Sequence, residues 1–277
     1  MLSIINNNSK LEDLLINFQS TYSKRNHLEH DIGYEEILQS YSSFVVKPEW
    51  ITTKFLNKAQ SNKLIPSYLN KREQYFSHED QYSNFLITEN LIDNFYSHLS
   101  QTHPRVSTFC SKLIKLILIA ELNHYIEGTT ADELGIAHID FKESYNQEDF
   151  NELIVHQITH TLLFIDDYIE PQVDDDKKNF LISTSLSHKR GGNKFPFYIL
   201  FHSVCVGLEV LSYRYENNSL DSPIHYHPTT EVAIKRCTNG INKLNEYIDL
   251  FTHSGKELLY KYHALHEELA KRIQYAQ

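Results

Sequence analysis

Helix-breaking residues are scarce in this chain: its 277 residues include only eight Gly and seven Pro. The long segments between them repeat apolar side chains every three or four positions, the spacing of helices that bury one face. We therefore predict a mainly α protein, a single helical domain with a few short strands. The predicted helices are residues 10–22, 34–44, 49–61, 79–100, 105–126, 147–168, 196–215, 229–251 and 254–275.

Two short segments, residues 135–141 and 179–183, have the composition of extended chain, and we expect them to flank the functional site. Residues 1–104 hold no recognisable chemical motif, and we interpret them as an N-terminal helical layer or cap. Residues 105–277 form the predicted catalytic region. We expect one integrated domain, because no low-complexity linker separates the two parts.

Charge and apolar runs exclude several classes of partner. The formal charge of −10 disfavours nucleic acids and anionic membranes, which require clustered Lys and Arg. The longest apolar run, residues 113–122, is interrupted by two charges and is too short to cross a bilayer. Three widely spaced cysteines favour a reducing compartment over a disulfide framework. We predict a cytoplasmic protein; the sequence does not indicate an oligomeric state.

The motif that points most directly to chemistry is a pair of histidines, His156 and His160, in the predicted helix 147–168. Four residues advance a helix by about 40° past one full turn, so both rings project from one face, as two ligands of one metal ion require. Leu153 and Leu163 share that stripe, which predicts an inward face. Burying two imidazoles is costly unless each has a partner, so metal binding is favoured over two core histidines satisfied by carbonyl groups.

The residue after the first histidine is Gln157, where a HExxH metallopeptidase has Glu. An amide cannot accept the proton of a metal-bound water, so the general base of such a hydrolase is missing while both ligands remain. The motif therefore predicts a metal site and argues against a zinc peptidase.

A third ligand is expected from the predicted helix 196–215, where His202 is a lone polar ring in a strongly apolar segment. A core histidine satisfied by hydrogen bonds is an equally good interpretation from this helix alone. Glu209, two turns further on the same face, offers a carboxylate instead. Upstream, the loop around Lys189 and Arg190 contains two glycines and positive charge, which suits an anionic co-substrate or a plain solvated turn.

A series of short segments follows in a fixed order along the chain: Gly-Ile-Ala-His-Ile-Asp at 135–140, Leu-Ile-Val-His-Gln-Ile-Thr-His at 153–160, an extended segment with Ser, a basic loop followed by Pro, Phe-His-Ser-Val-Cys-Val at 201–206 and Thr-His-Ser-Gly-Lys-Glu-Leu-Leu at 252–259. The order and spacing of these segments resemble the HExxH-motif 2-oxoglutarate-dependent peptide β-hydroxylases, over about residues 133–265. The chain departs from the family's pattern at Gln157, where the family has Glu, and in the loop 189–196, where the family has an Arg-Asp-Pro-Arg-Pro-like sequence.

The resemblance implies a mononuclear Fe(II) held by His156, His160 and His202, with 2-oxoglutarate and O2 as co-substrates. It implies hydroxylation of an amino-acid side chain at the β-carbon in a ribosomally made peptide, and we extend the expected substrate to a free amino acid. Arg190, followed by Lys189, is the expected anchor of 2-oxoglutarate. Conversion of 2-oxoglutarate to succinate would accompany substrate oxidation.

A helical di-iron oxidase is an alternative. Glu121 and His124 have the Glu-x-x-His spacing of helical di-iron proteins. Glu152 precedes His156 by four residues, so these four residues together with His160 would supply a di-iron site.

A non-catalytic accessory protein with a decayed metal site is another alternative, with Gln157 as the altered position. Two further histidines, His225 and His227, have the spacing that an extended strand places on one side. We expect them in an exposed loop or at the substrate entrance.

Overall fold

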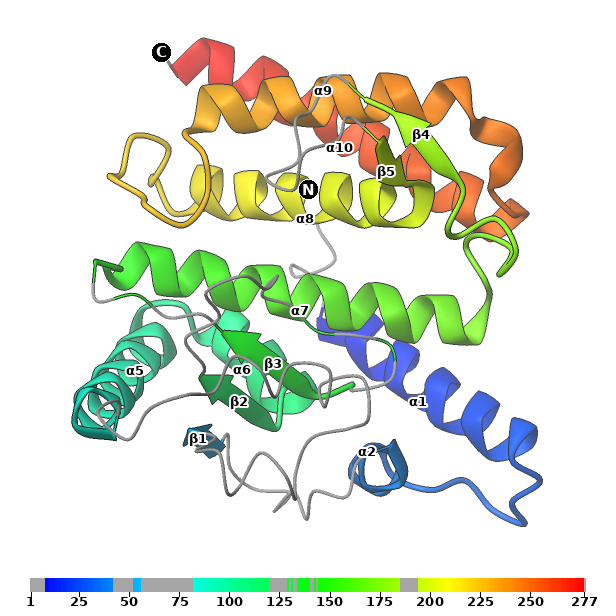
Figure 1. Ribbon diagram of the computed structural model, residues 1–277, viewed down its shortest axis with the longest axis horizontal. Coiled ribbons are helices and arrows are strands. Elements are labelled where there is room, and N and C mark those ends of the chain that lie inside the picture. Colours follow the sequence, from blue (N-terminus) through cyan, green and yellow to red (C-terminus); the bar gives the residue numbers. More distant parts are fainter. Residues whose placement is uncertain are drawn as a thin grey trace.

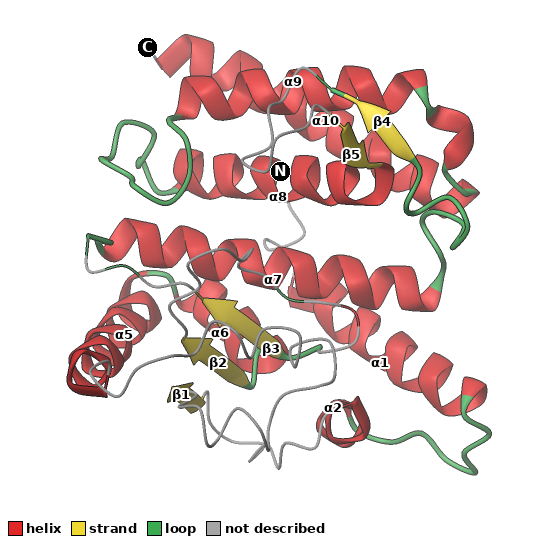
Figure 2. Cartoon of the chain, viewed as in Figure 1, coloured by secondary structure: helices red, strands yellow, loops and turns green. Residues whose placement is uncertain are grey.

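The computed structural model describes residues 8–41, 52–55, 82–119, 129, 131, 134–139, 142, 144–184 and 194–276. The fold is mainly α-helical, as predicted (Figure 1), and short strands form two small groups (Figure 2). The helices are α1 (Asn8–Arg25), α2 (Tyr34–Tyr41), α5 (Tyr82–Thr102), α6 (Pro104–Leu113), α7 (Gln147–Ile169), α8 (Phe197–Glu216), α9 (Thr230–Glu246) and α10 (His253–Ala276), with a 3-10 helix, η5 (Ile248–Leu250), between the last two.

The strands of the described residues form one parallel sheet and one antiparallel pair. Strands β1 (Thr52–Phe55), β2 (Leu116–Ile119) and β3 (Ile136–Ile139) lie side by side in that order and are parallel. Strands β4 (Leu181–Ser183) and β5 (Lys194–Pro196) are antiparallel. The two predicted extended segments therefore contain β3 and β4.

Two predicted helices are wrong where the parallel sheet forms. Residues 52–55, inside the predicted helix 49–61, are strand β1, and residues 116–119, inside 105–126, are strand β2. The sequence of β2, Leu-Ile-Leu-Ile, is a short continuous apolar run, which fits a buried parallel strand as well as a helix. Residues 49–51, 56–61 and 120–126 of these ranges lie outside the described residues.

Helix α7 runs through the middle of the protein (Figure 1). Helices α8, α9 and α10 lie on one side of it, and α1, α5, α6 and the parallel sheet lie on the other. The helix begins with a capping box, in which the side chains of Asn146 and Asp149 each accept a hydrogen bond of 3.0 Å from the other's backbone N–H. Between Asp149 and Leu163 every residue is buried except His156 and His160, which are partly exposed.

Two hydrophobic cores meet at α7 and α8. One core joins α1, α2, α5, α6 and the parallel sheet to α7, and the other joins α8, α9 and α10. Leu163 of α7 belongs to the second core and Val206 of α8 belongs to the first, so these helices tie the cores together. The division at residue 104 stays a prediction. Among the helices of the described residues, none has the length and apolar character needed to cross a bilayer.

Gly135, just before β3, is predicted to be a stability-determining position. Its φ is +80°, and a Cβ there would lie 2.5 Å from Leu38 Cδ1. The Gly135→Ala variant is expected to lower the free energy of unfolding by about 1–3 kcal/mol, because it adds backbone strain and overpacks the core. In the control Gly33→Ala the nearest atom to the new Cβ is 3.5 Å away, so only the poorer N-cap of α2 contributes and a loss of about 1 kcal/mol or less is expected. Urea denaturation measures both, and equal effects would contradict the prediction.

Candidate functional site

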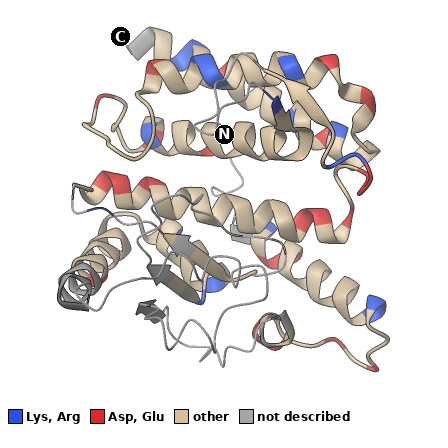
Figure 3. Cartoon of the chain, viewed as in Figure 1, with Lys and Arg blue, Asp and Glu red and all other residues tan. Residues whose placement is uncertain are grey.

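The two histidines of α7 lie next to each other, as their four-residue spacing predicts. The ring centroids of His156 and His160 are 4.8 Å apart. Residues 153–165 of α7 include no charged side chain, and Figure 3 shows the acidic residues of α7 toward its two ends. The two imidazoles are therefore on an uncharged stretch of the helix.

The third predicted histidine approaches this pair from α8, which packs along α7. Nδ1 of His202 is 3.4 Å from Nδ1 of His160, and the two ring centroids are 5.6 Å apart. The His202 side chain is only 3% exposed, and its buried Nε2 has no hydrogen-bond partner within the described part of the chain. The structure thus brings the three predicted ligand residues into one neighbourhood.

A fourth histidine, which the sequence analysis did not assign to the site, extends this arrangement. His227 lies in the loop between α8 and α9, residues 217–229. Its Nε2 is 3.1 Å from Nδ1 of His156, and the two rings are nearly parallel, at 20°. His225 is exposed. We call the four side chains the histidine row; their spatial order is His227, His156, His160, His202.

A buried ion pair lies behind His227. Arg214 Nε and Nη2 donate to the two carboxylate oxygens of Glu152 at 2.6 and 2.8 Å, and both side chains are at most 1% exposed. His227 Nδ1 is 2.9 Å from Glu152 Oε2. From the sequence, Glu152 is a candidate only as a di-iron ligand, and no local pattern identifies Arg214 as part of the site. Both oxygens of Glu152 are thus engaged in hydrogen bonds within this cluster.

The remaining predicted ligands are placed as follows. Glu209, the alternative third ligand, is buried, and its Oε1 accepts a hydrogen bond from Tyr262 of α10 at 3.3 Å. The proposed co-substrate anchor, Lys189 and Arg190, lies outside the described residues. The other di-iron candidates, Glu121 and His124, lie outside them as well.

The predicted ligand histidines are neutral at pH 7. Burial lowers the pKa of His160 to about 4. Burial and the imidazoles of His160 and His227 hold the pKa of His156 well below its usual value. Burial, His160 and Lys178 do the same for the pKa of His202. Neutral imidazoles keep the lone pair that a metal ion requires.

Glu152 is ionised for a different reason. Burial alone would raise its pKa, but the hydrogen bonds from Arg214 and His227 outweigh burial and lower the pKa of this carboxyl. The result is a carboxylate that only accepts hydrogen bonds.

Gln157 lies away from the histidine row. Its buried side chain accepts a hydrogen bond from the Thr129 hydroxyl at 3.1 Å, and that hydroxyl also lies 3.0 Å from the backbone oxygen of Ile136 in β3. Among the residues that the structure describes, the amide nitrogen of Gln157 finds no hydrogen-bond partner. The residue therefore packs against the sheet side of α7.

Imidazole nitrogens are suitable ligands for a metal ion, and two of them that bind one ion at about 2.1 Å lie about 3.0–3.4 Å apart. Nδ1 of His160 and Nδ1 of His202, two of the predicted ligands, have this spacing, at 3.4 Å. Nε2 of His202 is a further nitrogen that finds no hydrogen-bond partner among the described residues. Within the part of the chain that the structure describes, however, no three His, Cys, Asp or Glu side chains are grouped so that they could hold a metal ion.

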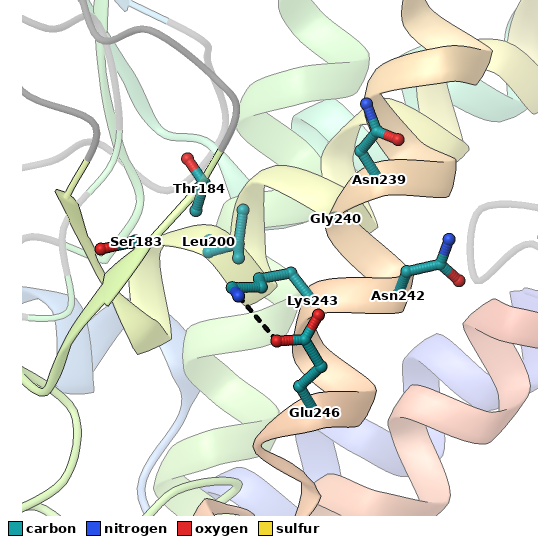
Figure 4. A pocket seen from close by; sticks show the side chains of 8 residues that line it. All are labelled: Ser183, Thr184, Leu200, Asn239, Gly240, Asn242, Lys243 and Glu246. Atoms are coloured by element: carbon teal, nitrogen blue, oxygen red, sulfur yellow. Dashed lines mark hydrogen bonds and ion pairs between the residues drawn. The ribbon is translucent and has the colours of Figure 1, made fainter.

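A shallow pocket of about 280 Å³ lies between β4, α8 and α9 (Figure 4). In it, Lys243 Nζ is 2.6 Å from a carboxylate oxygen of Glu246. No histidine of the row is among its lining residues, so the pocket is separate from the row. It is lined by Ser183, Thr184, Leu200, Asn239, Gly240, Asn242, Lys243 and Glu246.

Neither the protein-family models nor the curated proteins compared with this chain match it.

Arg214 is predicted to be essential for stability. The Arg214→Met variant would leave the buried Glu152 carboxylate without its main partner, and we expect the free energy of unfolding to fall by about 3–5 kcal/mol. Arg272→Met is the matched control, because Arg272 pairs with Glu268 at the surface, where side-chain exposures are 43% and 30%. Its loss is expected to cost about 1 kcal/mol or less. Denaturant titration distinguishes the two variants, and equally small losses would be inconsistent with a required ion pair.

Stability of the metal-free protein is predicted to fall in mild acid. The pKa values of His156, His160 and His202 are lower in the folded protein than in the unfolded chain, so the unfolded chain binds more protons. The contribution of these histidines to the free energy of unfolding is complete above the unfolded pKa of about 6.5. It is lost as the pH falls toward the folded pKa of His160, about 4. Denaturation of chelator-treated protein at several pH values tests this.

Two variants test whether the buried histidines cause this loss of stability in acid. His160→Gln is expected to flatten the pH profile. His253→Gln removes a histidine whose side chain is 85% exposed and is expected to leave the profile unchanged. A wild-type profile without a decline below about pH 6.5 would contradict the prediction.

Proposed function

We propose that this protein is a cytoplasmic Fe(II)- and 2-oxoglutarate-dependent dioxygenase that hydroxylates an amino-acid side chain, in a ribosomally made peptide or in a free amino acid. One observation carries the proposal: the neutral imidazoles of His156, His160 and His202 lie in contact between α7 and α8. The order of sequence motifs, which resembles that of the 2-oxoglutarate-dependent peptide β-hydroxylases, supports the reaction class.

The three histidines would hold the iron. Imidazole is a suitable ligand for Fe(II), and the buried, unpartnered Nε2 of His202 is a donor atom that a bound ion would satisfy. Bound Fe(II) would supply the oxidising chemistry in which O2 converts 2-oxoglutarate to succinate and CO2 and hydroxylates a substrate C–H bond.

Aromatic side chains lie next to the row at both of its ends. The ring centroid of Tyr198 is 4.2 Å from that of His202, and the ring centroid of Phe164 is 4.9 Å from it. Tyr226 lies 5.9 Å from His156 by the same measure. Such rings would present apolar faces to a bound side chain, which suits oxidation of a C–H bond.

Iron binding and 2-oxoglutarate turnover test the proposal. Metal-free protein is reconstituted with Fe(II) without oxygen, and metal analysis is expected to give about one iron per chain. Addition of 2-oxoglutarate is expected to produce a visible charge-transfer band that requires both components. Exposure to air should then yield succinate. Mass spectrometry on peptides and amino acids made alongside the protein should detect a gain of one oxygen.

Variants identify the ligands. His202→Ala is expected to abolish iron binding, whereas His225→Ala, which alters an exposed histidine, is expected to retain it. Full iron occupancy in His202→Ala would move the third ligand to another residue such as Glu209. Two irons per chain without succinate would identify a di-iron oxidase. Absence of iron binding would identify a non-catalytic protein.

A further inference from the structure

His227 is held in place by contacts that do not involve its own ring. The side chain of Asp149 in α7 accepts hydrogen bonds from the backbone N–H groups of His225 and Tyr226, at 2.6 and 2.7 Å. On the other side, Arg214 Nη1 donates to the backbone oxygen of Pro228 at 2.9 Å. The backbone is thus anchored immediately before and after His227.

The hydrogen bonds of Glu152 determine which nitrogen of His227 carries a proton. Both oxygens of Glu152 accept from Arg214, so the carboxylate is ionised and cannot donate. The His227 nitrogen that contacts Glu152 Oε2 at 2.9 Å, Nδ1, must therefore be the donor. A neutral imidazole has one N–H, so Nε2 of neutral His227 is an acceptor.

The tautomer of His156 follows from that of His227. The acceptor Nε2 of His227 faces Nδ1 of His156 at 3.1 Å, so the proton of neutral His156 lies on Nδ1. Its lone pair is then on Nε2. An isolated neutral histidine prefers the opposite tautomer, with the proton on Nε2, so the ion pair imposes the less common form on two successive rings.

We propose that Glu152 and His227 are positioning residues that hold His156 in its Nδ1–H tautomer, so that Nε2 of His156 is the atom presented to a metal ion. This inference rests on the proposed function for the identity of the ion. Hydrogen bonds from a ligand histidine to a carboxylate or another acceptor fix the tautomer and ring orientation, and their loss typically costs about 10–100-fold in metal affinity. His227 acts through His156 and is not itself assigned as a ligand.

The tautomers are measured directly in metal-free, 15N-labelled protein. Long-range 1H–15N correlation of imidazole rings, at about pH 8 where unperturbed histidines are neutral, identifies the protonated nitrogen of each ring. The Nδ1–H form is expected for both His156 and His227. Finding the Nε2–H form of His156 would overturn the proposal, whatever the metal content of the protein.

Two variants of His227 separate the positioning role from simple packing. His227→Phe keeps a ring but removes the acceptor, so His156 is expected to lose its Nδ1–H tautomer and Fe(II) affinity to fall about 10–100-fold. His227→Gln restores an N–H for Glu152 and an oxygen for His156, so partial recovery of both is expected. His225→Phe is the matched control, because it places the same ring two residues away at an exposed position.

Fe(II) affinity is measured without oxygen by competition with a chelator, and circular dichroism checks that each variant is folded. Unchanged tautomer and affinity in His227→Phe, with normal iron binding and succinate formation in the wild type, would overturn the positioning role alone. The expected tautomers in a wild-type protein that binds iron but forms no succinate would support the positioning role while rejecting the proposed function.

Discussion

The buried ion pair between Arg214 and Glu152 is the interaction on which the site depends. Taking such charges out of water costs several kcal/mol per ion, and a well-packed apolar pair is often as stable. The cost is offset here because the donors and acceptors are matched: Glu152 accepts from Arg214 and lies within hydrogen-bonding distance of His227, while Arg214 also donates to the backbone of Pro228. This cluster therefore joins α7, α8 and the loop 217–229, the three segments that supply the histidine row.

The burial of helix α7 is the second constraint on the site, because other elements cover both sides of this helix. A helix buried on all sides has no face that must be polar for solubility, so polar residues within it require partners in the protein. Between Asp149 and Leu163 the partly exposed positions are His156 and His160, and each has a ring nitrogen within 3.4 Å of another histidine. These two polar positions of a largely buried helix thus find partners on α8 and on the adjoining loop.

The helices and the adjacency of His156 and His160 follow from the sequence because they depend on spacing within one helix. Strand β2 does not follow from the sequence, because an apolar run of four residues is too short to distinguish the repeat of a helix from that of a strand. The contacts of His227 and Arg214 join residues 71 and 62 positions apart, beyond the reach of any local pattern. The sequence holds one weak signal: Glu152 directly precedes the apolar run 153–155, and an acid that such a helix buries requires a cation. That signal does not identify which cation.

The surroundings of Gln157 determine the effect of having an amide there instead of the Glu of a HExxH site. It follows His156 directly, but one position turns a helix by about 100°, and its side chain faces Thr129 instead of the histidine row. A carboxylate at this buried position would have one hydroxyl donor and would cost more to bury than the amide. Having Gln instead of Glu at this position therefore takes no carboxylate away from the histidine row. A reaction whose oxidising power comes from a bound cofactor accommodates this residue, whereas hydrolysis by a HExxH site requires an acid there.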